Sequence, residues 1–389
     1  MNQHYMSDRV LLILTPCYPD RDSRIIGDIF VKGQIEELRE YFKKIIVISP
    51  ILFSFKVLQN DKQCENYCYE NIEIFYPRCI YIPIFWTGPL LIDTRLKVIE
   101  NFIKINNINF DIIHAHFTWP FSYIGIKLKE KFGKPVIVTV HEDGDWFQQE
   151  ARMNHPLINT GWSNADALIR VNKKDVPALR KFNEMVFSIP NGYSPNFFPM
   201  DISIARGRLG LPDDKRILFA LGYLIKRKGF NYLIDAMKQI CNGRGDVICY
   251  IGGAGPEMKK LQQQIVQSNL NEKIHLLGSV PNEILTTWIN AADFFVMPSL
   301  NEGNPTVMFE ALGCGKPFIG TKVGGVPEVI ISEEYGLLVE PADAGDLAEK
   351  ILVALNRDWD RDRILAYASQ YTWKNIAKEI MGVYSKVSR

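Results

Sequence analysis

The sequence predicts an α/β protein made of two doubly wound domains, each built around a parallel sheet. The chain has 389 residues, which is long for a single hydrophobic core. Short apolar runs alternate with amphipathic helical segments along its whole length. Midway, the segment Ser188–Pro199 is dense in Pro, Asn and Gly, which predicts a connection between domains.

The first half begins with a predicted strand, Val10–Thr15, followed by an amphipathic helix over Ile29–Phe42. Repeated apolar runs after this helix indicate further strands of the same parallel sheet. They lie at Ile45–Ser49, Ile112–Ala115, Pro135–Val140, Ala167–Val171 and Val186–Ile189.

The alternation restarts after the connection, so we place the domain boundary between residues 195 and 196. Helices are predicted at Phe230–Ile240 and Met258–Ser268. Strands are predicted at Ile217–Gly222, Val247–Ile251, Lys273–Leu277, Phe294–Met297, Pro317–Gly320 and Gly336–Val339. Because open α/β sheets bind ligands beyond the carboxyl ends of their strands, we expect a small-molecule site between the two domains.

Composition excludes several classes of protein. The formal net charge is +1, which argues against nucleic-acid binding by neutralisation of phosphates. Seven scattered cysteines without a paired framework are typical of reduced thiols, and the first residues do not form a secretory signal. No charge-free run approaches the ~18 residues of a membrane-spanning helix. We therefore expect a cytoplasmic protein, and its oligomeric state is not indicated.

One apolar run is a candidate for contact with a membrane. It spans Cys79–Ile92 and contains Tyr81, Phe85 and Trp86. Aromatic side chains of this kind suit the interface of a lipid surface or a lipid-linked acceptor, which would make the protein peripheral at the inner face of the membrane. The alternative is a packed loop inside the first domain.

The strongest chemical signal is the run MPSLNEGNPTVMFEAL over Met297–Leu312. A strand ends in a polar loop, after which Asn304 is predicted to cap a helix whose first residue is Pro305. The backbone N–H groups near this helix start, including those of Gly303 and Thr306, suit a diphosphate.

Two carboxylates, Glu302 and Glu310, flank this predicted phosphate site. A carboxylate repels phosphate, so the pair makes sense if each accepts hydrogen bonds from hydroxyl groups. A ribose on one side and a hexose on the other would supply them. The alternative is a capped helix with two solvated glutamates.

Two further loops of the second half have the composition of phosphate-binding segments. LGYLIKRKGF (Leu221–Phe230) places Gly222 at a strand end, and its Arg227 and Lys228 could neutralise the phosphates of a leaving nucleotide. YIGGAGPE, which contains Gly253, is a glycine-rich turn suited to a phosphate or a nucleoside. Because no such turn follows the first strand, a NAD site is not expected.

In the first half, polar residues follow two predicted strands. His116 ends the strand that begins at Ile112, and His141 follows the strand that ends at Val140. Either imidazole could bond a sugar hydroxyl or a phosphate, or could be a structural residue. Asp143 could join them on the acceptor side. It could also chelate a metal with Asp145, but no companion ligands stand at useful spacing, so no metal or other cofactor is expected.

These motifs resemble glycosyltransferase family 4, the retaining GT-B transferases that use nucleotide sugars, and the resemblance spans nearly the whole chain. Its most specific elements are Glu302 and Glu310 within SLNEGNP…EALGCGKP, followed by GGVPEVI at Gly324–Ile330. The resemblance implies that the final helix (Tyr371–Lys386) returns to the first domain. The first domain, which would bind the acceptor, would then comprise residues 1–195 and 371–389. The second domain, which would bind the donor, would comprise residues 196–370.

The resemblance also implies roles for individual residues. Glu302 would contact the transferred sugar, Glu310 the ribose hydroxyls, and Lys228 the diphosphate. Gly27 would let the backbone approach the donor, and His141 would lie near the hydroxyls of the transferred sugar. One position departs from the family, which usually has Arg where this chain has Tyr223.

The sequence thus predicts a retaining hexosyltransferase. It would move a sugar from a nucleoside-diphosphate donor to a hydroxyl of a glycan or lipid-linked acceptor. The alternatives are an epimerase or a phosphorylase on the same fold, or a protein that binds nucleotide sugars without turning them over.

Overall fold

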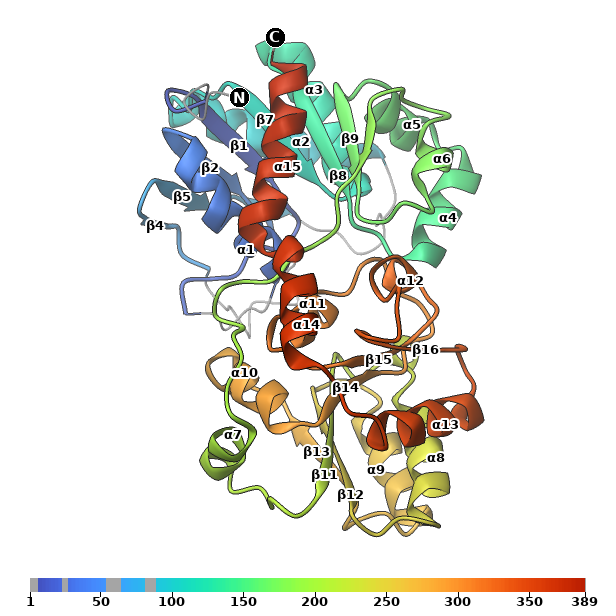
Figure 1. Cartoon of the computed structure of the whole chain (residues 1–389). Coiled ribbons are helices and arrows are strands. Elements are labelled where there is room, and N and C mark those ends of the chain that lie inside the picture. The colour runs from blue at the N-terminus through green and yellow to red at the C-terminus, as the bar shows by residue number, and fades with distance from the viewer. Residues whose placement is uncertain (1–5, 23–26, 54–63, 81–88, 389) are drawn as a thin grey trace. The chain divides into compact units, whose positions relative to one another are not determined.

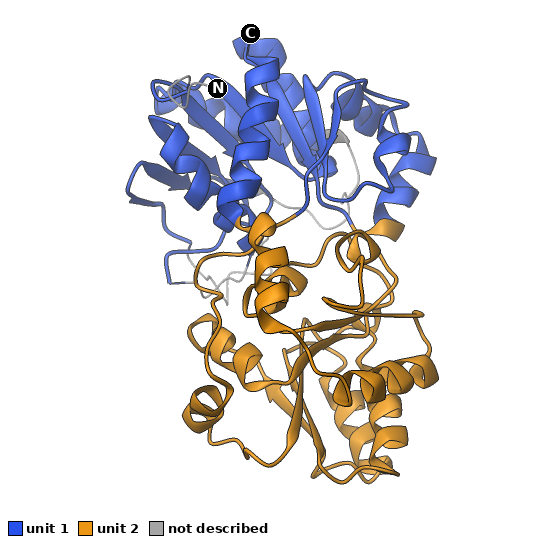
Figure 2. Cartoon of the chain, in the orientation of Figure 1, with its two compact units in different colours: residues 1–142, 146–190, 373–389 blue, residues 143–145, 191–372 orange. Residues whose placement is uncertain are grey.

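The computed structural model describes residues 6–22, 27–53, 64–80 and 89–388. Tyr81, Phe85 and Trp86, the aromatic residues considered for membrane contact, lie outside this set. The chain divides into two compact units (Figure 2). The first comprises Met1–Glu142, Trp146–Pro190 and Trp373–Arg389, and the second comprises Asp143–Asp145 and Asn191–Thr372.

The first unit contains an eight-stranded sheet with the order β10-β9-β8-β7-β1-β2-β5-β4. Its strands run parallel except for β4, which pairs antiparallel with β5. Because the chain winds outward from β1 in both directions, the sheet has a topological switch point between β1 and β7. The bounds are β1 Val10–Leu14, β2 Lys44–Ile48, β4 Tyr67–Tyr69, β5 Ile72–Phe75, β7 Ile112–His116, β8 Val136–Val140, β9 Ala167–Arg170 and β10 Val186–Ser188.

Helices cover both faces of this sheet because its strands alternate their buried side chains between two cores. Leu12 and Leu14 face one core, and Leu11 and Ile13 face the other. A short parallel pair, β3 (Ile51–Phe53) with β6 (Arg78–Ile80), lies outside the main sheet. The helices are α1 Ile29–Leu38, α2 Pro89–Ile105, α3 Tyr123–Phe132, α4 Gly144–Met153, α5 Pro156–Ser163, α6 Val176–Leu179 and α15 Trp373–Val387.

The last helix, α15, packs against α1 within the first unit (Figure 1). The two helices approach closely at Gly33, where an added Cβ would lie 2.3 Å from Nε1 of Trp373. Farther along α15, Tyr384 is fully buried against the sheet. Helix α15 thus completes the hydrophobic core of the first unit.

The second unit has a six-stranded, fully parallel sheet with the order β13-β12-β11-β14-β15-β16. Its switch point lies between β11 and β14. The strands are β11 Arg216–Leu221, β12 Val247–Gly252, β13 Ile274–Gly278, β14 Phe294–Met297, β15 Phe318–Thr321 and β16 Gly336–Val339. The helices are α7 Ile202–Leu209, α8 Phe230–Cys241, α9 Met258–Gln267, α10 Asn282–Ala291, α11 Thr306–Gly313, α12 Val326–Val329, α13 Ala344–Leu355 and α14 Arg361–Ala368.

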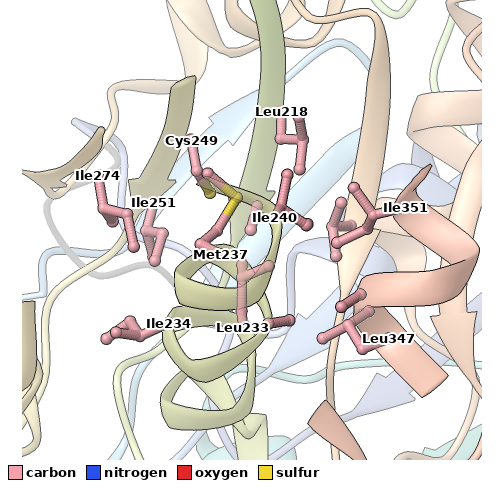
Figure 3. Packing of buried hydrophobic residues seen from close by; sticks show 14 of the residues in the cluster. Leu218, Leu233, Ile234, Met237, Ile240, Cys249, Ile251, Ile274, Leu347 and Ile351 are labelled. Atoms are coloured by element: carbon pink, nitrogen blue, oxygen red, sulfur yellow. The ribbon is translucent and has the colours of Figure 1, made fainter. Parts of the chain in front are cut away.

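One core of the second unit lies between the sheet and the helices α8, α9 and α13 (Figure 3). Leu233, Met237 and Ile240 of α8 point toward strand residues such as Leu218 and Cys249. Burial of each such side chain stabilises the fold by roughly 1.5–3 kcal/mol, so this layer fixes the loops that leave the strands.

The predicted fold class is confirmed: two doubly wound α/β units are present. Every strand predicted from the sequence corresponds to an observed strand within one or two residues at each end. The strands that sequence reasoning missed, β3 to β6, are short, and three of them have only three residues. Among the helices of the described residues, none is both long and apolar enough to cross a membrane.

Candidate functional site

Two loops meet at the switch point of the second sheet, one after β11 and one after β14. The N–H of Leu300 donates to the carbonyl of Arg227 over 2.7 Å. Gly229 has a positive φ of 65°, and a Cβ there would lie 2.0 Å from the carbonyl oxygen of Pro298. Only glycine allows this approach without strain, so the two loops form one unit at the strand ends.

Glu302 is the centre of this loop pair. Its side chain is 6% exposed, and its Oε1 lies 2.6 Å from Nζ of Lys228. Oγ of Ser299 donates to the same oxygen over 2.7 Å, and Nη1 of Arg227 lies 3.5 Å from Oε2. A buried carboxylate is stable only with such partners. The structure therefore brings together three residues of the predicted site: Arg227, Lys228 and Glu302.

Arg227 links the two loops further. Its Nη1 donates to the backbone carbonyl of Asn301 over 2.9 Å, while its side chain remains 36% exposed. Glu302 thus holds Lys228 in place, and Arg227 lies close to both Glu302 and Asp143, whose Oδ2 is 3.8 Å from its Nε. The guanidinium of Arg227 stays accessible to solvent. An anion that enters this site meets cations whose side-chain entropy is already lost, which favours binding.

The start of α11 differs from the prediction by one residue. Thr306 is the first helical residue and Pro305 occupies the N-cap, whereas Asn304 was predicted as the cap. The Asn304 amide is engaged elsewhere: its Oδ1 accepts from the N–H of Asn191, and its backbone carbonyl accepts from Asn191 Nδ2, both over 2.7 Å. Since proline has no side-chain acceptor, the N-cap residue makes no side-chain hydrogen bond to the first N–H groups of the helix.

Glu310 lies in the second turn of α11 and is half-buried. Its carboxyl group forms no hydrogen bond or ion pair with any residue that the structure describes, although its backbone carbonyl accepts from the N–H of Cys314 over 3.1 Å. Burial raises the pKa of its carboxyl group to about 8. A carboxyl group with free acceptor oxygens in a desolvated position is suited to hydroxyl donors, because such bonds favour its charged form.

The glycine-rich turn after β12 supports the basic loop. Gly253 has a φ of 136°, and a Cβ there would lie 1.9 Å from the carbonyl oxygen of Gly222. The N–H of Leu224 donates to the carbonyl of Ala254 over 2.8 Å. The turn thus fixes the loop that carries Arg227 and Lys228, and its predicted contact with a phosphate or nucleoside stays a prediction. Tyr223 is 60% exposed.

In the first unit, Gly27 closes the loop between β1 and α1. A Cβ at Gly27 would lie 2.3 Å from the carbonyl oxygen of Cys17. The next residue, Asp28, accepts hydrogen bonds from Thr15 Oγ1 at 2.8 Å and from the N–H of Cys17 at 3.2 Å. Burial raises the pKa of Asp28 to about 6. The close packing shows why glycine is needed at position 27.

The two predicted histidines are brought into contact. Nδ1 of His116 and Nε2 of His141 lie 2.9 Å apart, and the rings are stacked with centroids 5.2 Å apart. Asp143 groups with the second unit, where its Oδ1 accepts from Asn301 Nδ2 over 2.7 Å. Its assignment to the acceptor side stays a prediction. In the described part of the chain, no group of three or more His, Cys, Asp or Glu residues could hold a metal ion.

Sequence reasoning missed several partners of these residues. His114 could have been found, because residues two apart in a strand share a face and His116 was already singled out. Ser299 and Asn191 gave no comparable signal, since their roles depend on contacts between loops that sequence spacing does not predict. Tyr384, which bonds His114, lies 270 residues away from it in the chain.

Comparison with solved structures defines the class of protein. Sucrose-phosphate synthase from Thermosynechococcus elongatus superposes with a TM-score of 0.78 at 21% identity, covering 97% of this chain and 99% of that one. Anabaena HepE in complex with UDP gives a TM-score of 0.72 at 21% identity, covering 97% and 100%. The fold is therefore that of the GT-B glycosyltransferases.

Family models identify the family. The model described as Glycosyltransferase Family 4 matches residues 58–197, and the model described as Glycosyl transferases group 1 matches residues 201–371. The putative teichuronic acid biosynthesis glycosyltransferase TuaC of Bacillus subtilis is 27% identical over 367 residues, which cover 88% of each chain. The chain belongs to glycosyltransferase family 4 and is a glycosyltransferase.

Proposed function

We propose that the protein is a retaining transferase that moves a hexose from a nucleoside-diphosphate sugar to a hydroxyl group. The acceptor would be a glycan or a lipid-linked sugar. The second unit would bind the donor and the first unit the acceptor. The observation that carries the proposal is the buried cluster of Glu302 with Lys228, Arg227 and Ser299 at the switch point of the second sheet.

The donor would lie with its diphosphate beside the basic loop and the start of α11. Lys228 and Arg227 supply positive charge, and the uncapped N–H groups at Thr306 supply hydrogen-bond donors. Glu310, whose oxygens have no partner in the described part of the chain, would accept hydrogen bonds from the ribose hydroxyls. Gly222 and Gly303 would give the nucleotide close access to the backbone.

Catalysis would consist mainly of stabilising the leaving diphosphate. The bond between the anomeric carbon and the phosphate oxygen breaks, and Lys228 and Arg227 balance the charge that develops. The acceptor oxygen bonds the same face of the anomeric carbon, which retains its configuration. The acceptor's proton passes to the leaving phosphate. Glu302 and His141 would position the transferred sugar through its hydroxyls.

UDP is the first nucleotide to test, because the structure of Anabaena HepE contains it. The full-length protein would be incubated with UDP-, GDP- and ADP-hexoses, with and without oligosaccharide or polyprenyl-linked acceptors. Release of nucleoside diphosphate that depends on the acceptor, with the anomeric configuration of the product retained, is the expected result.

Each alternative gives a different outcome. An epimerase converts the donor sugar without releasing nucleotide, and a phosphorylase requires inorganic phosphate. A binding protein gains thermal stability from a nucleotide sugar but does not turn it over. Any of these three patterns, or inversion of the anomeric configuration, would contradict the proposal.

A further inference from the structure

Two glutamates that the proposed chemistry does not use lie close together inside the first unit. Glu142 follows β8 and is 7% exposed, and Glu150 lies in α4 and is 3% exposed. The hydroxyl of Thr118 interacts with both carboxyl groups, so both lie within reach of one oxygen atom. Because a buried carboxylate is stable only with hydrogen-bond donors, the donors around the two groups decide how many protons they hold.

Each carboxyl group has a donor at one oxygen and none at the other. Oε1 of Glu142 accepts from the N–H of Thr118 over 2.6 Å, and Oε1 of Glu150 accepts from Nε1 of Trp146 over 3.0 Å. Both Oε2 atoms are buried and have no hydrogen-bond partner in the described part of the chain.

The guanidinium of Arg170 does not supply the missing donors. It is fully buried, and its Nε and Nη2 donate to Oδ2 of Asp175 over 3.1 and 2.6 Å. Its Nη1 donates to two backbone carbonyls, one of them that of Glu142. Its charge lowers the pKa of both glutamates, but burial raises these values more, that of Glu150 to about 9. Burial lowers the pKa of His141, so the imidazole next to Glu142 in the chain is neutral.

The number of protons on the pair follows from these bonds. With no proton, two anionic oxygens lie buried without donors. With two protons, the Oε2 atoms present two O–H donors to each other, and one of them has no acceptor there. A single proton provides one donor and one acceptor, so both Oε2 atoms are paired at once.

We infer that Glu142 and Glu150 share one proton between their Oε2 atoms and form a pH-sensitive anchor in the first unit. Through Thr118 and Trp146 the pair joins three segments: the turn after β7, the end of β8 and the start of α4. Loss of the proton at high pH sets two buried carboxylates against each other and loosens this junction. Neither the donor nor the acceptor of the proposed function enters this inference.

The pH dependence of stability gives the first test, made by urea denaturation of the full-length protein. The pKa of Glu150 rises from 4.5 to about 9 in the folded protein, so its contribution to stability is complete below pH 4.5 and is lost as the pH rises through 9. Glu150→Gln keeps a donor at every pH. Relative to this variant, the unfolding equilibrium constant of the unaltered protein should rise about tenfold for each pH unit between pH 5 and 9.

The double variant Glu142→Gln/Glu150→Gln tests whether the proton is shared. Each single variant sets one amide N–H₂ against one carboxylate, whereas the double variant sets two N–H₂ groups against each other without an acceptor. We therefore expect the double variant to melt well below both single variants at pH 7. The infrared band of protonated carboxyl groups should be as weak in each single variant as in the double variant, because the remaining carboxylate of each single variant is ionised.

Three results would overturn the inference. They are a double variant as stable as the single variants, an effect of Glu150→Gln that does not change with pH, and a further loss of the infrared band in the double variant, which would show a second proton. Glu184→Gln, at an exposed glutamate of the same unit, is the control and should change neither the pH dependence nor the band.

Discussion

The two units place their candidate residues at equivalent positions, beyond the carboxyl ends of strands near a topological switch point, but the chemistry differs. In the second unit the residues are charged, and Glu302 is held by Lys228 and Arg227. In the first unit they are neutral imidazoles, with pKa values lowered by burial. The same fold thus presents an ionic site in one unit and a neutral hydrogen-bonding site in the other.

This difference matches what each unit would bind in a sugar transfer. A diphosphate carries charge that must be balanced, and preformed cations do so with little reorganisation. A sugar hydroxyl is neutral and needs a donor or acceptor of fixed direction, and a neutral imidazole has one of each. The comparison predicts that substitutions in the second unit weaken binding or transfer because a charge is lost. Substitutions in the first unit should act because a hydrogen bond of fixed direction is lost.

The largest effect is expected at the centre of the ionic cluster. Glu302→Gln removes the charge that anchors Lys228 while conserving shape, and we expect kcat for transfer to fall by ~10²–10³. Acceptor-dependent release of nucleoside diphosphate measures it, and thermal melting verifies folding. Glu333→Gln, at an exposed glutamate of the same unit, is the matched control. If the Glu302→Gln enzyme kept half of its activity or more, the proposed role of Glu302 in transfer would be contradicted.

Lys228→Ala should act mainly on donor binding. Loss of a charge-assisted hydrogen bond costs ~1.5–3 kcal/mol, so the Kd for UDP or another matching nucleotide should rise by ~10–100-fold. Titration calorimetry at low and high salt gives the comparison, since the loss should shrink as salt screens the charge. Lys226→Ala, two residues away and exposed, should change Kd little. Equal losses in both variants would show that only the general charge of the loop matters.

Sequence patterns predicted the fold because apolar runs separated by helical segments mark every strand of the two main sheets except β4 and β5. They also selected Glu302, Lys228 and His141 as candidates, since each lies within a few residues of a predicted strand end. The structure places Lys228 against Glu302, and the roles of all three residues stay predictions. The cap of α11 was predicted wrongly. Local propensity favours Asn304 as the N-cap, but its amide oxygen accepts a hydrogen bond from the N–H of Asn191 instead. Ser299 and Tyr384 could not be predicted, because tertiary packing alone brings them to their partners.

The protonation of Glu310 in the second unit can be measured without a ligand, from the pH dependence of thermal stability. Its pKa rises from an ordinary value near 4.5 to about 8 in the folded protein, so the folded state holds a proton that the unfolded chain releases between those values. Its contribution to stability is therefore complete below pH 4.5 and is lost as the pH rises through 8. Glu310→Gln should melt about 2–6 °C higher than the unaltered protein at pH 9, with the difference vanishing near pH 5. A difference that does not depend on pH would mean that Glu310 is ionised at neutral pH.

The smallest effect is expected in the first unit, where the change is purely one of hydrogen bonding. Tyr384→Phe removes the hydroxyl that bonds Nδ1 of His114 and leaves that nitrogen buried without a partner. We expect the free energy of unfolding to fall by ~1–2 kcal/mol, measured by urea denaturation. Tyr41→Phe is the control, since the Tyr41 hydroxyl bonds no other residue in the described part of the chain. The Kd for the nucleotide should be unchanged in both variants, because the change leaves every charge of the second unit in place. If Tyr384→Phe weakened nucleotide binding as strongly as Lys228→Ala, the division into an ionic and a neutral site would fail, and the stacked rings of His114, His116 and His141 would have to act on the donor site as well.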